Sequence, residues 1–329
     1  MCSRFLAVRC RHLLVALLVA LSACGPPDSG SLDQATITLV IPYHPGGGFD
    51  RAARAFAPFL ASELGPDANV LPENVPGAGG RRGATKVFKA RPDGTTLGVF
   101  NLPGFVLPEI LGEKVDYDLR NMSWIGQLES QPYALLVPGT SELRSIADIR
   151  QLEQITFLST GYGASVLAAT QIAAESFRLA DEDPIFLSGY AGTADYLVGL
   201  IRGDGHVGIA PVSTAAPYID SGDLRPLAVS GAISTLEGVP TFAELGYPEL
   251  ADLGVRRSIA GPPGIDSQLL GQLRDAFMRA ATNPEFQAMA ANMRLELSPL
   301  DGDEAAAAVA ASFTFYEAFR TNLRNPNAL

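Results

Sequence analysis

The sequence predicts an α/β fold of two domains, each a mainly parallel sheet flanked by helices. Short β-rich runs alternate with longer segments of helical period through most of the 329 residues. That length is large for a single hydrophobic core and comfortable for two domains. We therefore expect a series of strand, loop and helix units, with no internal repeat.

The N-terminus has the pattern of a secretory signal. Three arginines precede the apolar run Leu13–Leu21, which is much shorter than the roughly 20 residues that a membrane-spanning helix needs. The run continues into LSAC, which resembles a bacterial lipobox ending at Cys24. Residues 1–23 would then be removed, Cys24 would carry lipid, and residues 24–34 would form a flexible tether. An ordinary signal peptide cleaved nearby is the alternative.

A lipid on Cys24 would hold an exported protein to a membrane in the periplasm. No other run is apolar and long enough to span a bilayer, so we expect membrane contact through this lipid alone. Gly25 is not the acidic residue that retains many lipoproteins at the inner membrane, which favours the outer membrane. The other two cysteines lie in the signal, so disulfides and cysteine catalysis are not expected.

Composition and motifs argue against several classes of function. The formal net charge of −11 makes nucleic acid an improbable partner. Only His44 and His206 follow the signal, and neither lies in a metal-binding pattern. A nucleophile elbow and a phosphate loop are both missing, and GAGGRR at Gly77–Arg82 is only a partial dinucleotide fingerprint. We expect no enzyme activity, no metal and no cofactor.

The first unit contains three consecutive glycines. Ala35–Tyr43 is predicted to be a buried strand and Asp50–Leu64 a helix, with Asp50 as its N-cap. The glycines Gly46–Gly48 lie between them. A glycine loop at a helix N-terminus exposes N–H groups to an anion and lets a carboxylate approach the backbone. A simple tight turn capped by Asp50 is the alternative, and local spacing does not separate the two.

A second loop repeats this pattern. LSTGYGASVLAA combines a strand end, a G-x-G turn and the start of a helix predicted over Ser165–Phe177. If the two loops face each other across a cleft, the hydroxyls of Ser159, Thr160 and Ser165 could help to hold one carboxylate. Alternatively, Ser165 is an N-cap and Tyr162 a surface aromatic residue.

A third corner, GYAGTADYL, precedes a helix predicted over Thr193–Arg202. Tyr190 is a candidate lid and Thr193 a candidate hydroxyl ligand, whereas Asp195 is more simply a first-turn acid that interacts with the helix dipole. The C-terminal part is expected to be mostly helical. The predicted helices there span Ser267–Thr282, Pro284–Met293 and Asp303–Arg320.

Arg256 and Arg257 form an adjacent pair between a glycine and SIAGPPG. An inward-pointing arginine could pair with a second carboxylate of a ligand. A solvated surface pair is the simpler interpretation. His44 is likewise most simply a solvated loop residue.

Seven blocks occur in the order and spacing of a known family: ITLVIPYHPGGGFDRAAR, ENVPGAGGRRGA, RPDGTTL, GYAGTADYL, SGDLRPLAVSG, GVPTFAELGYPEL and GPPGI. From about Thr36 onward the chain resembles the periplasmic solute receptors of tripartite tricarboxylate transporters, the Bug-type receptors. The resemblance implies a type II periplasmic-binding-protein fold, a two-domain Venus flytrap without catalysis. It also implies a first domain of residues 35–133 plus 255–329 and a second of residues 134–254, joined by crossover strands.

In this family a ligand carboxylate lies in the interdomain cleft between the two glycine loops. The resemblance, together with the inward interpretation of Arg257, gives these candidate ligand-binding residues: Tyr43, His44, Pro45, Gly46, Gly47, Gly48, Phe49, Asp50, Asn101, Ser159, Thr160, Gly161, Tyr162, Gly163, Ala164, Ser165, Tyr190, Gly192, Thr193 and Arg257.

The chain departs from the family pattern near the expected ligand. Phe49 stands where many members have a small or hydroxyl residue, and Thr95 where they often have an aromatic residue. Leu167 replaces a histidine, and Arg256 takes about the place of a tryptophan. These changes leave the first carboxylate site intact and alter the surroundings of the rest of the ligand.

The expected function is to bind a small organic carboxylate, such as a di- or tricarboxylate, and deliver it to the membrane permease subunits of a tripartite transporter. We expect a monomer. A receptor that signals to a partner protein instead is the first alternative. An exported α/β enzyme is the second, disfavoured by the missing catalytic motifs.

Overall fold

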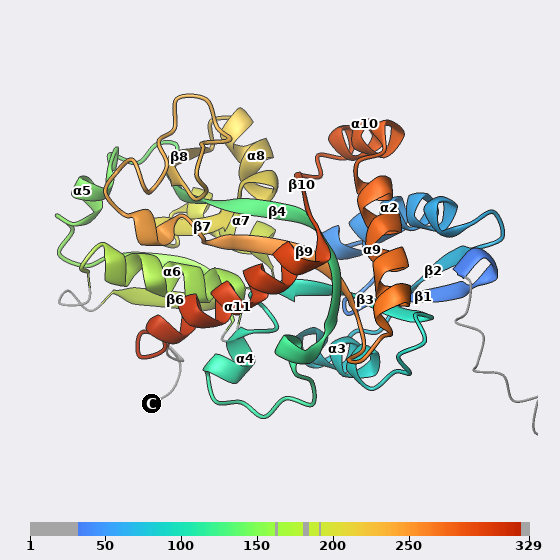
Figure 1. The fold of residues 1–329 in the computed structure, drawn as a ribbon. Helices are drawn as coiled ribbons and strands as arrows, with labels where there is room; N and C mark the ends of the chain where they lie inside the picture. Colours follow the sequence, from blue (N-terminus) through green and yellow to red (C-terminus); the bar gives the residue numbers. More distant parts are fainter. Residues whose placement is uncertain (1–31, 162–163, 180–183, 191, 324–329) are drawn as a thin grey trace, which may run out of the picture.

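The computed structural model describes residues 32–161, 164–179, 184–190 and 192–323 (Figure 1). The predicted signal and Cys24 lie outside these residues, as do Tyr162 and Gly163 of the second glycine loop. Within the described ranges, we find no helix with the length and apolar character needed to cross a bilayer.

The described strands form two sheets that share one long strand, β4. The first sheet contains, in spatial order, β2 (Asn69–Asn74), β1 (Thr36–Ile41), β3 (Thr96–Leu102), β9 (Gly254–Gly261) and β4 (Ser123–Pro138), with β10 (Leu297–Leu300) also paired to β4. The second sheet continues from β4 through β7 (Val207–Pro211), β5 (Thr156–Thr160) and β6 (Ile185–Tyr190), with β8 (Leu224–Val229) also paired to β4.

The predicted parallel pairing is found in the outer part of each sheet. Strand β1 pairs in parallel with β2 and β3, and β5 pairs in parallel with β6 and β7. The ladders made by β4 and β9 are antiparallel. Strand β4 runs from the first sheet towards the second, and β9 runs beside it in the opposite direction, so the two strands pair in antiparallel orientation.

Strand β4 changes its partners in the middle of the molecule. Residues 123–132 pair with β9, and residues from Tyr133 onward pair with β7 and β8. Trp124 lies near the beginning of β4, buried against Phe100, with its indole N–H donating to the carbonyl of Leu119. The exact domain boundaries, at residues 133/134 and 254/255, stay a prediction.

Helices cover the sheets of both halves (Figure 1). Around the first sheet lie α2 (Gly48–Leu64), α3 (Arg81–Phe88), α4 (Leu107–Ile110), α9 (Ser267–Ala281) and α10 (Pro284–Asn292). Around the second lie α5 (Ile146–Ile149), α6 (Ser165–Ser176), α7 (Thr193–Arg202) and α8 (Val212–Asp220). The last helix, α11 (Gly302–Ala318), packs along β4 and reaches α4.

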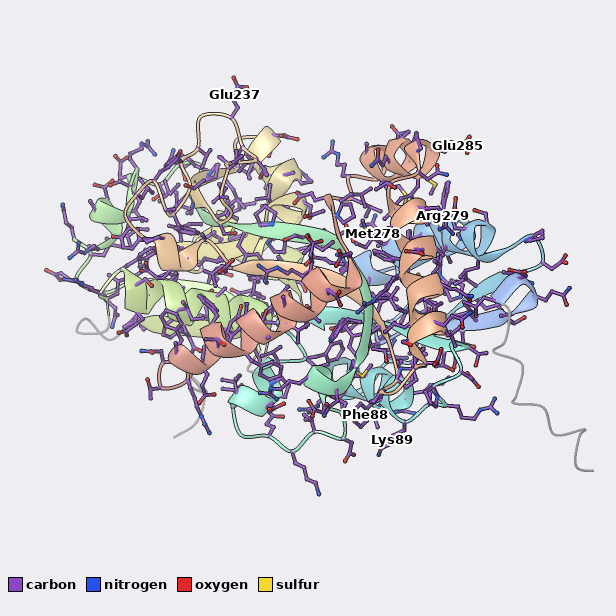
Figure 2. All side chains as sticks on the ribbon, in the orientation of Figure 1. Phe88, Lys89, Glu237, Met278, Arg279 and Glu285 are labelled. Carbon is purple, nitrogen blue, oxygen red and sulfur yellow. The ribbon has the colours of Figure 1, made fainter. Side chains whose placement is uncertain are left out.

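Apolar packing joins α2, α9 and α10 into one layer. The ring of Phe56 contacts the rings of Phe277 and Phe286, and the distance between ring centroids is 5.2 Å in each pair. At the edge of this layer, Arg279 on α9 forms an ion pair of 2.7 Å with Glu63 on α2 (Figure 2 labels Arg279). The C-terminal helices are thus bound to the N-terminal helix, far from them in sequence.

Several predicted helices are confirmed within two residues at each end, including α6, α7, α9, α10 and α11. The first helix differs at its start. It begins at Gly48 with Gly47 as N-cap, so the prediction that Asp50 is the N-cap is wrong. Asp50 lies in the first turn instead, because its carboxylate is used in contacts with the preceding loop and with β2.

We expect Gly126→Ala to lower the free energy of unfolding by about 1–3 kcal/mol, because overpacking a filled site costs this much. A Cβ at Gly126 on β4 would lie 2.2 Å from the Phe277 ring and 2.8 Å from the carbonyl oxygen of Leu300. Gly271→Ala is the matched control, since nothing lies within 4 Å of its Cβ position on α9. That change should stabilise the protein by about 0.5–1 kcal/mol. Urea unfolding measures both, and equal effects of the two changes would contradict the packing argument.

Candidate functional site

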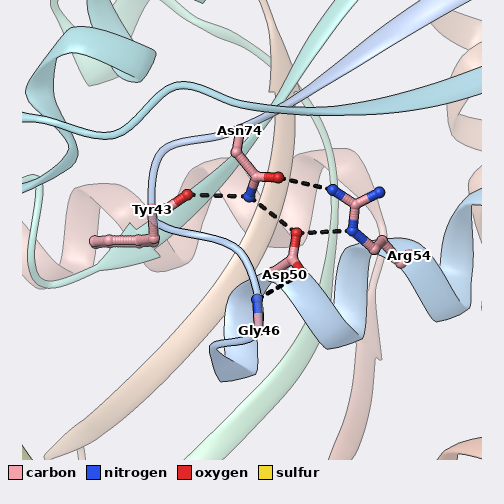
Figure 3. Close-up of polar contacts among 5 residues, drawn as sticks. All are labelled: Tyr43, Gly46, Asp50, Arg54 and Asn74. Carbon is pink, nitrogen blue, oxygen red and sulfur yellow. Dashed lines mark hydrogen bonds and ion pairs between the residues drawn. The ribbon is translucent and has the colours of Figure 1, made fainter.

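The glycine loop before α2 is held by a buried carboxylate. Asp50, 5% exposed, accepts hydrogen bonds from the N–H of Gly46 at 2.9 Å, from Arg54 Nε at 2.8 Å and from Asn74 Nδ2 at 2.9 Å (Figure 3). Gly46 has φ of +87°, a conformation that favours glycine. The loop therefore has a fixed shape set by its own residues and by β2.

Asn74, at the end of β2, ties this loop to the sheet. Its Nδ2 also donates to the carbonyl of Tyr43 at 3.0 Å, and its Oδ1 accepts from Arg54 at 2.7 Å. Burial alone would raise the pKa of Asp50, but the hydrogen bonds from Gly46, Asn74 and Arg54 outweigh it and hold the pKa below its ordinary value. Asp50 is thus ionised at neutral pH and acts as a brace for the loop.

The start of α2 presents unpaired N–H groups. Gly47, Gly48 and Phe49 have no acceptor for their N–H groups among the described residues, as expected for the first turn of a helix. The 17-residue helix directs its positive end at this point. The geometry is that of an anion cradle, and no side chain caps it.

The second loop supplies hydroxyl groups from the other half. Ala164 is the N-cap of α6, so the alternative in which Ser165 caps this helix is wrong. The Ser165 hydroxyl instead accepts a hydrogen bond of 3.1 Å from the Tyr133 hydroxyl of β4. Thr160 Oγ1 and Ser159 Oγ are buried and have no hydrogen-bond partner within the described part of the chain. Thr160 can therefore accept or donate a further hydrogen bond.

Tyr43 and Asn101 form a polar pair on the first half. Asn101 Nδ2 donates to the Tyr43 hydroxyl at 2.9 Å, while Asn101 Oδ1 is buried without a partner among the described residues. Burial raises the pKa of Tyr43 to about 12 despite the hydrogen bond from Asn101. The phenol keeps its proton at neutral pH and can donate a hydrogen bond to a ligand.

Two adjoining cavities lie between the halves. The first, which we call the hydroxyl cavity, has a volume of about 630 Å³ and is lined by Tyr43, Ala78, Gly79, Arg81, Asn101, Gly104, Pro108, Glu113, Thr160, Gly161, Ala164 and Ser165. The second, the arginine cavity, has about 470 Å³ and is lined by Gly48, Phe49, Arg51, Asn101, Gln131, Tyr133, Ser165, Val166, Thr193, Pro211, Ser213, Thr214, Pro217, Val255, Arg257, Met293, Arg294 and Leu295. They meet at Asn101 and Ser165, one residue from each half.

The structure brings part of the predicted site together. These candidates line one or both cavities: Tyr43, Gly48, Phe49, Asn101, Thr160, Gly161, Ala164, Ser165, Thr193 and Arg257. These do not: His44, Pro45, Gly46, Gly47, Asp50, Ser159, Tyr190 and Gly192. Tyr190 donates a hydrogen bond of 2.9 Å to Asp204, which holds its ring at the strand edge. The role of each candidate in binding stays a prediction.

Arg257 is buried, contrary to the interpretation of a solvated surface pair. It is 6% exposed and forms an ion pair with Glu129, which is fully buried and lies directly opposite on β4. Its guanidinium also lies 4.6 Å from the ring centroid of Phe49. A Cβ at Gly48 would lie 2.8 Å from Arg257 Nη2, so this guanidinium touches the start of α2.

Glu129 and Glu296 are polar residues that the sequence analysis missed. Burial raises the pKa of Glu129, although the charge of Arg257 opposes this. Burial also raises the pKa of Glu296 to about 7, with a further contribution from Glu129. The sequence signal for a buried acid is Glu129 itself, an acidic residue in a run that continues into the apolar segment YALLVP. Among the described residues there is no cluster of three potential metal ligands.

Comparison with known proteins agrees with this architecture. Residues 52–312 match the family model described as "Tripartite tricarboxylate transporter family receptor". The chain belongs to this family. It is 28% identical over 270 residues to Protein BugT of Bordetella pertussis, and this match covers 78% of the chain and 80% of BugT.

Two solved structures show the same fold. One is a TctC solute binding protein from Polaromonas, with a TM-score of 0.75 and 22% identity over 88% of this chain and 99% of the other. The second is MatC from Rhodopseudomonas palustris with bound malate, with a TM-score of 0.70 and 22% identity over 87% of this chain and 99% of MatC. The two-domain periplasmic-binding-protein fold is thereby confirmed, and family and fold are those of substrate-binding receptors.

We expect Asp50→Asn to lower the free energy of unfolding by about 1–3 kcal/mol at pH 7, because an amide NH2 would face donors that now bind a carboxylate. Asp195→Asn is the matched control, since Asp195 is an exposed first-turn acid of α7, and should change stability by less than about 1 kcal/mol. Because the pKa of Asp50 is lowered on folding, its contribution exists at neutral pH and is lost as pH falls below about 3.9. If the parent protein remains more stable than Asp50→Asn in acid, the ionised carboxylate of Asp50 is not the group that stabilises the loop.

Glu296→Gln tests the raised pKa of Glu296. The folded state holds a proton on Glu296 between its ordinary pKa of 4.5 and about 7, where the unfolded state does not, so this group makes stability fall as pH rises through that window. The variant should melt a few degrees higher than the parent at pH 8, about 2–4 °C per kcal/mol, and show no advantage at pH 4. Glu237→Gln, on a side chain that extends from the surface in Figure 2, should show no such trend.

Proposed function

We propose that the protein is an extracytoplasmic receptor that binds a small carboxylate between its domains and delivers it to a tripartite tricarboxylate-type permease. One observation carries this proposal. The uncapped start of α2, at Gly48 and Phe49, and the unpaired hydroxyl of Thr160 in the second half line cavities that meet at Asn101 and Ser165. Oriented N–H and O–H donors are the groups that recognise a carboxylate.

Binding would favour closure of the two domains. A carboxylate that accepts from the Tyr43 hydroxyl of one half and the Thr160 hydroxyl of the other gains contacts that an open state lacks. Strands β4 and β9, which pass between the sheets, are the proposed hinge. The cradle is formed before binding because Asp50 and Asn74 hold it, so little ordering is needed on association.

The chemistry of the ligand is proposed from the site and from a relative. MatC, which has the same fold, was solved with malate bound. A small dicarboxylate is therefore the first ligand to consider here. We further propose that the receptor works in the periplasm as a monomer, anchored through lipid on Cys24, with the permease subunits as its protein partners.

The direct test is a thermal-shift screen of residues 25–329, which include every described residue. Mono-, di- and tricarboxylates, amino acids and aromatic acids would be compared. A ligand that binds only the folded state stabilises it by about 2.7 kcal/mol at a hundredfold excess over Kd, a clear rise in melting temperature. If no compound raises the melting temperature of folded protein that retained no ligand from purification, the receptor proposal is overturned.

Thr160→Val separates binding from stability. The buried Thr160 hydroxyl has no hydrogen-bond partner among the described residues. Its removal should therefore leave the free energy of unfolding unchanged or raise it slightly. Carboxylate affinity should fall about tenfold or more, the effect of losing a hydrogen bond to a charged group. Thr170→Val is the matched control. Its hydroxyl donates to the carbonyl of Val166 at 2.7 Å, so stability should fall by about 1 kcal/mol while affinity is kept.

A further inference from the structure

One groove on the first half of the molecule contains every lysine of the chain. The sequence has only three lysines, Lys86, Lys89 and Lys114, although lysine and arginine together number 24. All three line a groove of about 750 Å³ between α3 and the loop of residues 113–116. Because Lys114 comes from a different segment than the other two, the fold produces this grouping. We call this feature the lysine groove.

Helix α3 forms one wall of the groove with a stripe of basic residues. Arg82, Lys86 and Lys89 follow one another at spacings of four and three residues, which places them on the same side of the helix. Ala84 and Val87, on the other side, are buried in the core. The three basic side chains are exposed, and Figure 2 labels Lys89 at the lower edge of the molecule. The helix thus presents positive charge to solvent along its length.

The groove holds more positive than negative charge. Arg81 forms an ion pair with Glu113 inside it, and Lys86 forms an ion pair of 2.6 Å with Glu73. The second acidic residue of the lining is Asp116. The lining residues that have positive charge and no ion-pair partner in the described part of the chain are Arg82, Lys89 and Lys114. In a chain with a formal net charge of −11, this local excess attracts an anionic group.

The lysine groove adjoins the proposed ligand site. Ala78, Arg81 and Glu113 line both the groove and the hydroxyl cavity. The lysines themselves line neither of the two cavities between the halves. An occupant of the groove would therefore lie beside a bound ligand without taking its place. This is where a protein that takes up the ligand has to approach.

We propose that the lysine groove is the docking surface for an acidic segment of the membrane protein that receives the ligand. The inference rests on the proposed function and adds the surface by which its partner is recognised. Aspartate and glutamate side chains of the segment would pair with Arg82, Lys89 and Lys114. Exposed charge pairs of this kind speed encounter and fix orientation more than they add affinity, which suits a partner that must be released again.

Shape and charge favour a protein segment over an anionic membrane surface. A bilayer surface cannot enter a groove with α3 as one wall and residues 113–116 as the other. Glu113 and Asp116 lie in the lining and would repel anionic lipid headgroups. A protein segment can enter the groove and place a polar or basic group against Asp116.

Fluorescently labelled octaglutamate is the probe that tests the docking surface. Its anisotropy would be measured with residues 25–329, the same protein that is used in the carboxylate screen. We expect binding at low salt that is lost in 0.5 M NaCl, because salt screens exposed charges. The double variant Lys89→Gln with Lys114→Gln should weaken this binding about three- to tenfold, the effect of losing two exposed charge pairs.

Two further double variants are matched controls. Lys89→Arg with Lys114→Arg keeps both charges and should keep the affinity for octaglutamate. Arg144→Gln with Arg150→Gln removes two charges from exposed positions on either side of α5, outside the groove, and should leave the affinity unchanged. The Lys→Gln variant should also keep the rise in melting temperature with a carboxylate, because neither lysine lines a ligand cavity.

The outcomes separate this inference from the proposed function. If octaglutamate does not bind, or if the Arg144→Gln and Arg150→Gln variant weakens it equally, the docking surface is overturned and the carboxylate receptor stands. If phosphatidylglycerol vesicles bind through the lysines and octaglutamate does not, the groove recognises a membrane and the acidic segment is overturned. If no carboxylate binds in the screen, the proposed function is overturned, and with it the identity of the partner.

Discussion

Strand β4 belongs to both sheets, and the positions of all groups in the cleft depend on this constraint. Its first part pairs with β9 and its second part with β7 and β8, so the two halves cannot move apart without bending this strand and β9. Tyr133 lies where the partners change, and its hydroxyl reaches Ser165 in the second glycine loop. A single continuous strand thereby sets the distance between two loops that are more than a hundred residues apart.

The ion pair of Arg257 and Glu129 shows how the same pair of strands builds charge into the cleft. The two residues are directly opposite each other on antiparallel strands, where cross-strand side chains are in reach of one another. Burying a guanidinium is costly unless a partner compensates it. Glu129 supplies that compensation from behind, and one edge of Arg257 stays against Gly48 and Phe49 at the start of α2.

Local features of this protein could be predicted from the sequence, and features that depend on register could not. Helices such as α7 and α9 follow from periodicity within the segment, and the glycine loops follow from their composition. The role of Asp50 was assigned wrongly because it depends on Asn74, 24 residues away, which draws the carboxylate into the loop. The burial of Arg257 depends on Glu129, 128 residues away, through a strand register that neither segment encodes alone.

The brace of the first loop, Asp50 with Asn74 and Arg54, lies outside the linings of the two cavities. Together these three residues fix the loop. Arg51, an exposed residue of the cavity lining with no part in the brace, can therefore vary without loosening the loop. Descendants of one ancestral receptor could therefore diverge at the cavity wall while inheriting the same loop conformation.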